Sequence, residues 1–256
     1  MNRPLLTSIV GESLTFATGN LVRAMNAARG AVAVEVRGTT LASAGWNFTP
    51  RLAKAFKFTA VGSVYRDDTL TLSERGTNTT VTYNSMVATN DFLYVGVEVP
   101  FRGAYVNLVN ANGTASVLSG FYWDGATWTG LTETDGTTSG GATLAIDNAI
   151  TWTVPTDWTT TSVNGSAQLF WVRFNSDGGT DSATSLAEVI PLPIQPSVSS
   201  AVGGADLPIL VGSAAAANMY YFDTDLIGGI ELTEANTGVI RVEWLCAGKA
   251  ALAFVQ

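Results

Sequence analysis

The stretch FYWDGATWTGL, from Phe121 to Leu131, places four aromatic rings around an Asp-Gly turn. Aromatic residues and threonine are typical of strands, and a DG pair between two such runs indicates a β-hairpin. If DGAT is a four-residue loop, Trp123 and Trp128 lie opposite each other. If the turn is only Asp-Gly, Phe121 takes that place opposite Trp128. Either register predicts a packed aromatic layer and therefore a protein that is mainly β.

Runs of the same kind continue on both sides of this hairpin. The chain between Asn90 and Pro193 contains FLYVGVEV, GAYVNLVNA, TASVLSGFYW, TWTGL, AITWTVP and AQLFWVRFNS, with DG, NG or GG clusters between them. Regular turns without intervening helices are typical of a β-sandwich or jelly roll. We therefore expect an aromatic-rich β-sandwich over residues 89–193.

Residues 1–88 form a first flanking section that is also expected to be mostly β. AVAVEVRG is typical of a strand, whereas NLVRAMNAARG, from Asn20 to Gly30, is a candidate short helix that ends at the glycine. DTLTLSERGTNTTVTYNSM alternates on both sides of a Gly/Asn turn, which predicts a hairpin.

Residues 194–206 are rich in proline, serine and glycine and are expected to be a linker. Residues 207–256 then form a small C-terminal β section with the runs LPILVG, NMYYFDTD, GGIELTEA, GVIRVEWLCAG and KAALAFVQ. A section of about 50 residues is small for an independent core. It is therefore expected to pack against its neighbour or against a second copy of the chain.

The charge pattern excludes several partners. The chain has a formal net charge of −8 and contains no cluster of Lys and Arg that could neutralise several phosphates, so direct binding to nucleic acid is not expected. No run approaches the roughly 20 apolar residues of a membrane span, and the first residues lack the apolar core of an export signal. The single cysteine, Cys246, is expected to be a small buried hydrophobe.

The absence of histidine excludes the commonest general base, the Ser-His-Asp triad and the commonest metal ligand. Glycoside hydrolysis needs only two carboxylates, which leaves four candidates in the aromatic section: Asp124, Asp135, Asp147 and Asp157. Each lies beside glycine, asparagine or threonine, where aspartate commonly caps a turn. We therefore expect no enzyme, no catalytic residue and no cofactor.

A second carboxylate pair lies in NSDGGTDS, from Asn175 to Ser182. Asp177 and Asp181 could offer oxygen ligands to calcium there, but the segment lacks the alternating acidic positions and the closing glutamate of an EF-hand. A solvated turn is the preferred interpretation, and no metal site is expected.

Five of the seven tryptophans lie between Trp123 and Trp171. They either form a core or expose a platform on which a sugar could stack, with Trp123, Trp128 or Trp158 as the platform rings. The rings lie within alternating strands, which favours the core. Arg173 is expected to reach solvent or a turn carboxylate such as Asp157.

Residues in this section also resemble a known family. The quoted elements are Tyr94 to Gly96, Phe101, YWDGATW, Asp135 to Thr137, Trp152, Pro155 to Trp158 and FWVRF. Their order resembles a β-sandwich domain of structural proteins in tailed bacteriophages, over about 100 residues. The spaced tryptophans carry most of this resemblance.

The resemblance implies a non-enzymatic virion protein assembled in the bacterial cytoplasm. We expect a head decoration, cement or minor capsid protein that binds the virion as an oligomer, with the major capsid protein or other virion proteins as partners. A tail tube, tail fibre or baseplate component is the structural alternative. A carbohydrate-binding module for host attachment is the alternative from a different class.

Overall fold

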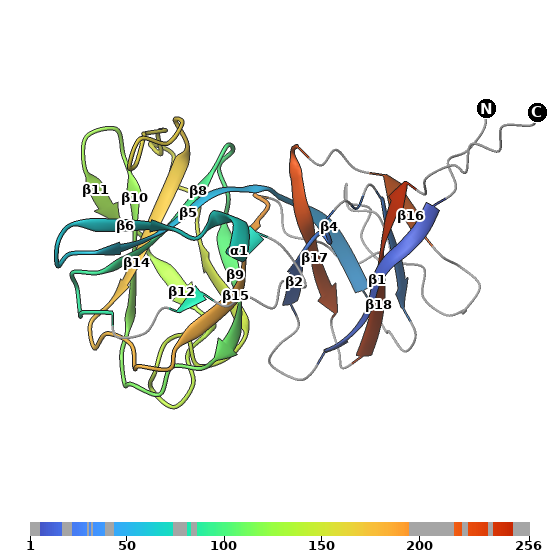
Figure 1. Cartoon of the computed structure of the whole chain (residues 1–256), viewed down its shortest axis with the longest axis horizontal. Coiled ribbons are helices and arrows are strands. Elements are labelled where there is room, and N and C mark those ends of the chain that lie inside the picture. Colours follow the sequence, from blue (N-terminus) through green and yellow to red (C-terminus); the bar gives the residue numbers. More distant parts are fainter. Residues whose placement is uncertain are drawn as a thin grey trace, which may run out of the picture.

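The computed structural model describes residues 6–16, 22–29, 31, 33–38, 44–73, 81–82, 86–194, 218–221, 225–234 and 238–247. These residues form two β lobes side by side (Figure 1). The middle of the chain builds the central sandwich, which comprises the elements from β5 to β15. Strands from both flanks of the sequence build the second lobe, here called the flanking lobe. The expected mainly β fold is confirmed.

The central sandwich consists of two antiparallel sheets. A six-stranded sheet has the order β11-β10-β14-β8-β5-β6, with β5 (Leu52–Thr59), β6 (Val64–Asp67), β8 (Phe92–Val97), β10 (Leu118–Trp123), β11 (Trp128–Gly130) and β14 (Phe170–Ser176). A five-stranded sheet has the order β12-β13-β9-β15-β7, with β7 (Val81–Thr82), β9 (Gly103–Asn110), β12 (Glu133–Asp135), β13 (Asn148–Trp152) and β15 (Ser185–Leu192). The sequence analysis did not identify β12 or β15 as strands.

The main core lies between these two sheets. Alternation along β10 points Leu118 and Tyr122 inward, and alternation along β14 does the same for Val172 and Phe174. Trp152 packs on this core from the five-stranded sheet, and its indole N–H donates to the carbonyl oxygen of Phe101 at 3.0 Å. Burying a ring of this size contributes about 2 to 3 kcal/mol, so aromatic residues supply much of the stability of the core.

The flanking lobe joins the two ends of the described sequence. One sheet has the order β1-β18-β3-β16, with β1 (Leu6–Phe16), β3 (Ala33–Gly38), β16 (Asn218–Tyr221) and β18 (Gly238–Ala247). The other has the order β2-β17-β4, with β2 (Val22–Asn26), β4 (Ala44–Pro50) and β17 (Ile227–Glu234). Phe16, Met25, Trp46 and Trp244 are buried between these sheets. The C-terminal strands therefore share both sheets, and a common core, with N-terminal strands.

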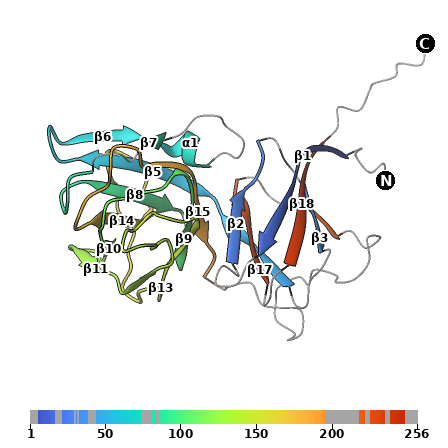
Figure 2. The ribbon, with the colours of Figure 1, turned by 90° about the horizontal axis from the view of Figure 1, so that it is seen from below.

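Polar and apolar contacts connect the two lobes. Arg102 of the central sandwich forms an ion pair with Glu231 of β17, whose side chain is fully buried. Asn26 of β2 donates from its side-chain amide to the carbonyl oxygen of Leu72 at 2.9 Å. Figure 2 shows β2 beside β15, where Ala24 packs in one apolar cluster with residues of the central sandwich. Removing one partner of a buried ion pair typically costs about 3 to 5 kcal/mol, because the other charge is then left buried without compensation.

The helix expected at Asn20 to Gly30 is wrong, because residues 22–26 form strand β2. Residues Ala24, Met25 and Asn26 are all buried, and β2 pairs along its length with β17. The partner strand lies some 200 residues away in sequence, and its pairing outweighs the local helix signal.

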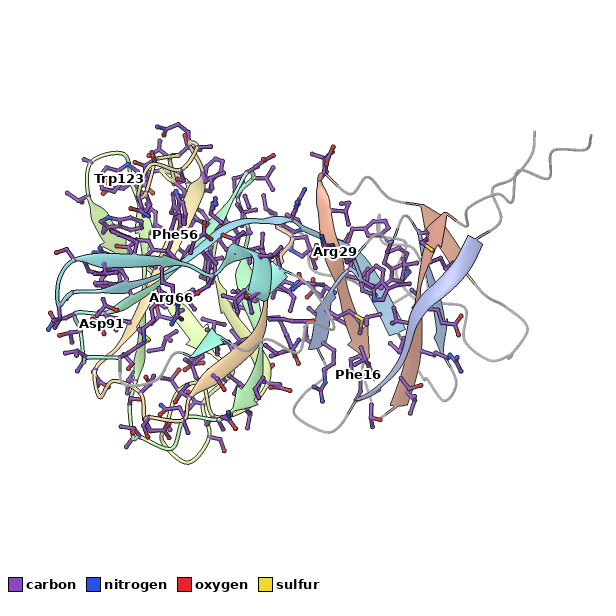
Figure 3. The ribbon with its side chains drawn as sticks, viewed as in Figure 1. Phe16, Arg29, Phe56, Arg66, Asp91 and Trp123 are labelled. Atoms are coloured by element: carbon purple, nitrogen blue, oxygen red, sulfur yellow. The ribbon has the colours of Figure 1, made fainter. Side chains whose placement is uncertain are left out.

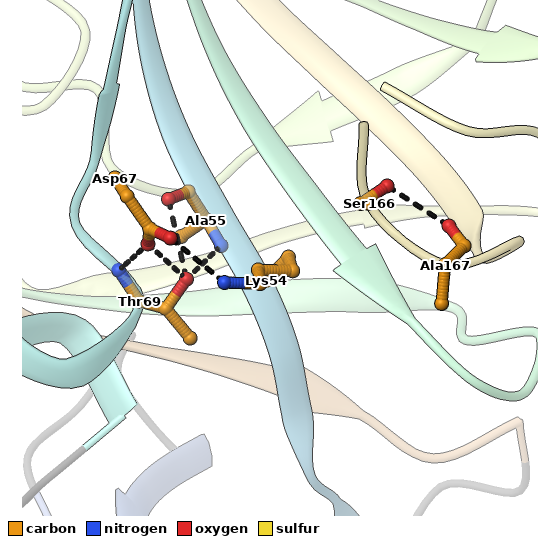
Figure 4. Close-up of polar contacts among 6 residues, drawn as sticks. All are labelled: Lys54, Ala55, Asp67, Thr69, Ser166 and Ala167. Carbon is orange, nitrogen blue, oxygen red and sulfur yellow. Dashed lines mark hydrogen bonds and ion pairs between the residues drawn. The ribbon is translucent and has the colours of Figure 1, made fainter. Parts of the chain in front are cut away.

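The hairpin expected over residues 68–86 is also wrong in its first half, which forms the short helix α1 (Thr69–Ser73). Asp67 accepts hydrogen bonds from the backbone N–H and hydroxyl of Thr69 and pairs with Lys54 (Figure 4). These contacts cap the first turn, and Leu72 is fully buried beneath it. The second half contains β7, which pairs with β15 and not with a hairpin partner.

The expected domain boundary at residues 88 and 89 does not follow the sheets. Strands β5 and β6, within residues 52–67, belong to the same sheet as β8, β10 and β14. The sandwich therefore begins near Leu52 and includes α1. Apart from Ile194, the expected linker at 194–206 lies outside the described residues, as do LPILVG and KAALAFVQ. No helix in the described part is long and apolar enough to cross a membrane.

Candidate functional site

The candidate site lies on the outer face of the six-stranded sheet, which points away from the core. Cross-strand pairing places Phe121 beside Arg173, Arg173 beside Tyr94, and Tyr94 beside Phe56. A parallel row pairs Phe92 with Phe58 and Phe58 with Tyr65. Two neighbouring rows of an outward-facing sheet surface therefore consist almost entirely of aromatic side chains.

Trp171 occupies the covered part of this face and is fully buried. Val163 and Leu169, from the segment after β13, pack against it, and its indole N–H donates to the carbonyl oxygen of Thr161 at 2.9 Å. The ring also stacks on Phe56 at 5.6 Å between centroids. The segment after β13 thus acts as a third layer over one part of the sheet.

No described segment covers the rest of the face in this way. It forms the aromatic patch, defined here as Arg173 and six half-buried rings: Phe58, Tyr65, Phe92, Phe121, Trp123 and Trp128. Trp123 and Trp128 are opposite each other in the β10–β11 hairpin, which confirms the four-residue DGAT loop. Their rings meet edge to face at 5.7 Å between centroids. Figure 3 shows Trp123 on the side of the central sandwich away from the flanking lobe.

Arg173 lies in the middle of the aromatic patch. Its guanidinium carbon is 4.2 Å from the ring centroid of Phe92, 4.6 Å from that of Trp128 and 5.4 Å from that of Phe121. Its Nη1 donates to the hydroxyl oxygen of Tyr94 at 3.2 Å. Three cation–π contacts of this kind fix the position of the guanidinium.

Two alternatives were expected for Arg173, solvent or a turn carboxylate such as Asp157, and the second is wrong, because among the described residues no carboxylate pairs with Arg173. The carboxylate of Asp157 instead accepts a hydrogen bond from the hydroxyl of Tyr122 at 2.8 Å. Within the described part of the chain, the Arg173 cation contacts aromatic rings and the hydroxyl oxygen of Tyr94.

Tyr65 contributes a neutral phenol to the patch. Burial, and then the neighbouring Tyr94, raise the pKa of Tyr65 to about 12. Its hydroxyl therefore keeps its proton at physiological pH and adds a polar but uncharged group to the patch.

Asp124 caps the hairpin that carries Trp123 and Trp128. Its carboxylate accepts hydrogen bonds from the backbone N–H groups of Thr127 at 2.7 Å and Ala126 at 2.8 Å. These bonds lower the pKa of Asp124 to about 2. A carboxyl group that remains ionised in this way is unsuited to donate a proton as a general acid.

The other three carboxylates considered for hydrolysis also have structural partners. Asp157 accepts a hydrogen bond from the hydroxyl of Tyr122, as described above. Asp135 accepts one from the backbone N–H of Thr137, and Asp147 accepts one from the backbone N–H of Leu108. Asp124, Asp147 and Asp157 lie in separate turns or loops, and Asp135 is the last residue of β12, from which it caps the turn that follows.

The candidate calcium loop is held by similar contacts. Asp177 accepts a hydrogen bond from the backbone N–H of Val117 at 2.6 Å, and Asp181 accepts one from that of Gly113 at 2.7 Å. Within the described part of the chain, no group of three acidic, cysteine or histidine side chains could hold a metal ion. Cys246 is half-buried in β18, so it is more accessible than expected.

Of the three predicted platform rings, the structure brings Trp123 and Trp128 together on the outer face and separates Trp158 from them. Trp158 is buried in the main core, with its ring 5.1 Å from that of Phe101. The sequence analysis missed Phe92 and Arg173 as members of the patch. The local sequence indicates that they lie on the outer face only through their alternation with the inward residues of β8 and β14.

A groove of about 910 Å³ lies between the lobes and was also missed. Exposed apolar side chains line it, including Leu70, Val99, Ile194 and Leu226. Lys54 and Asp67 form an ion pair at its wall. Because both lobes contribute to it, no single stretch of sequence could have revealed it.

Comparison with models of known protein families gives no match for this chain, and no curated protein matches it.

Proposed function

We propose that the protein is a non-enzymatic structural component of a bacteriophage virion, assembled in the host cytoplasm. Its most specific form is a head decoration, cement or minor capsid protein that binds the virion as an oligomer. The observation that carries the proposal is that the residues bearing the phage resemblance build one sandwich. Phe101, Trp152 and Trp158 lie in its core, and the FWVRF strand is the centre of its six-stranded sheet.

The chemistry of the carboxylates supports a structural role. Asp124, Asp135, Asp147 and Asp157 are each engaged in a turn or in a contact with a core tyrosine. Side chains of this kind stabilise loops and are not arranged around a shared cleft.

The test is co-sedimentation of the purified chain with expanded empty heads and with separated tails, combined with light scattering of the free protein. Pelleting with heads, through the major capsid protein, is the expected result. Pelleting with tails alone would replace the head proposal with a tail tube, tail fibre or baseplate component. Failure to pellet with either would overturn the virion proposal.

A second candidate function is carbohydrate binding for host attachment. The specific observation in its favour is the aromatic patch, because half-exposed rings on an open sheet face can stack on the apolar face of a sugar. A glycan array tests this function directly, and the absence of binding to any glycan would remove it.

A further inference from the structure

We propose that the aromatic patch binds an acidic sugar, with the carboxylate of a uronic acid residue at Arg173 and the sugar ring against Trp128 and Phe92. This inference rests on the second proposed function and specifies its ligand class. It adds Arg173, Phe92 and Phe121 to the tryptophans as the residues that select the ligand.

The free edge of Arg173 indicates an anionic ligand. Nη1 is used by Tyr94, and Nε is sealed from solvent with no partner. Nη2 has no partner among the described residues and is not among the sealed atoms. A carboxylate bound at this edge would form a charge-assisted hydrogen bond, which is roughly twice as strong as a neutral one.

The rings around Arg173 hold it in place before any ligand arrives. Phe92 and Trp128 both lie within 5 Å of the guanidinium carbon, so the side chain has little freedom left to lose. Pre-organisation of this kind lowers the entropic cost of binding. The same rings offer partly exposed surfaces to the C–H groups of a sugar.

The size of the patch favours a small ligand over a protein partner. The patch consists of six half-buried rings and Arg173, whereas a standard protein interface involves about 20 to 30 residues from each partner. Face-to-face docking of two copies would also bring two Arg173 cations together. Nucleic acid is disfavoured because its binding neutralises several phosphates, whereas the aromatic patch as defined contains the single cation Arg173.

The experiment is a titration of the full chain with trigalacturonate and with its methyl ester, followed by tryptophan fluorescence and calorimetry. The ester retains the sugar rings and loses the negative charges. We expect the acid to bind about tenfold more tightly or better, and Trp123 and Trp128 to report binding as a change in fluorescence.

Variants locate the site. Arg173→Met keeps the apolar stem and removes the charge, so it should abolish the preference for the acid over the ester. Lys54→Met is the matched control, because Lys54 is a cation on the same sheet that is already paired with Asp67 and lies outside the patch. It should leave both affinities unchanged. If Arg173→Met does not fold, Arg173→Lys keeps the charge without the planar fork and should weaken binding of the acid.

The outcomes separate the two proposals. Equal binding of acid and ester overturns the acidic-sugar inference and leaves carbohydrate binding intact. Binding of neither, together with an empty glycan array, overturns both. Two further results also overturn the inference: tighter binding of a single-stranded oligonucleotide than of trigalacturonate, or a change in oligomeric state of Arg173→Met without any sugar binding. Co-sedimentation with heads is independent of all these results.

Discussion

On strand β10, Tyr122 points into the core of the sandwich, whereas its neighbours Phe121 and Trp123 lie on the outer face. The same contrast recurs on β14, where Phe174 is inward and Arg173 is outward. Both faces of the six-stranded sheet are rich in aromatic residues. The inner face is covered by the five-stranded sheet, whereas the described residues cover the outer face only around Trp171. Whether another layer covers a face, more than which residue types the face contains, therefore decides whether that face is core or a candidate binding surface.

The largest expected effect is that of Trp171→Ala. Trp171 lies on the outer face yet is fully buried, so the substitution leaves a cavity and removes the hydrogen bond from the indole to the carbonyl oxygen of Thr161. We expect the free energy of unfolding to fall by about 3 to 5 kcal/mol, measured by chemical denaturation. A melting temperature lowered by only a degree or two would show that the segment after β13 does not cover this ring.

Gly96→Ala tests how closely Trp171 lies on the sheet. A Cβ at Gly96 would lie 2.7 Å from the Trp171 ring, which must then move. We expect a loss of about 1 to 3 kcal/mol in the free energy of unfolding. Gly130→Ala on β11 is the matched control, because a Cβ there meets nothing within 4 Å. Equal stability of the two variants would contradict the close packing of Trp171.

Trp128→Ala provides the direct contrast with Trp171→Ala. Trp128 is half-buried in the aromatic patch and loses mainly its contacts with Trp123, Tyr94 and Arg173. We expect a loss of about 1 kcal/mol in thermal or chemical unfolding. A loss as large as that of Trp171→Ala would mean that the patch is a continuation of the core.

Asp124→Asn is expected to have the smallest effect, which should depend on pH. The folded-state pKa of Asp124 is lowered to about 2 by bonds from Thr127 and Ala126. Its stabilisation of the hairpin is therefore present above about pH 4 and is lost as the pH falls through about 2. The melting temperature of the variant should change less than that of the parent chain between pH 5 and pH 2, as recorded by circular dichroism. Parallel curves would show that the cap does not stabilise the hairpin.

Local patterns in the sequence were sufficient for much of the central sandwich. Alternation and turn residues predicted β8, β9, β10, β11, β13 and β14. They left two registers open for the hairpin, of which the structure has the one with the DGAT loop, with Trp123 opposite Trp128. These features depend on neighbours a few residues apart, which a sequence shows directly.

Other predictions from the sequence were wrong because they concern strands that pair with segments distant in sequence. Residues 22–26 form a strand because β17 pairs with them, and β18 lies between β1 and β3 although the sequence separates it from both. The aromatic patch was only partly anticipated for the same reason. Arg173 was expected to reach solvent or a turn carboxylate, but the adjacent strands place it beside Phe92 and Phe121.

The sequence by itself determined that this protein is built from β-strands, where many of them turn, and which residues share a face. Those properties follow from the two-residue period of a strand and from the local hydrogen bonds of turn aspartates such as Asp124. The tertiary structure decided which aromatic face is covered, that the first and last described strands share one sheet, and that Arg173 lies among aromatic rings. Each of these depends on segments that are distant in sequence. The alternation along a strand shows which residues share a face, but a different part of the chain must pack on that face to bury it.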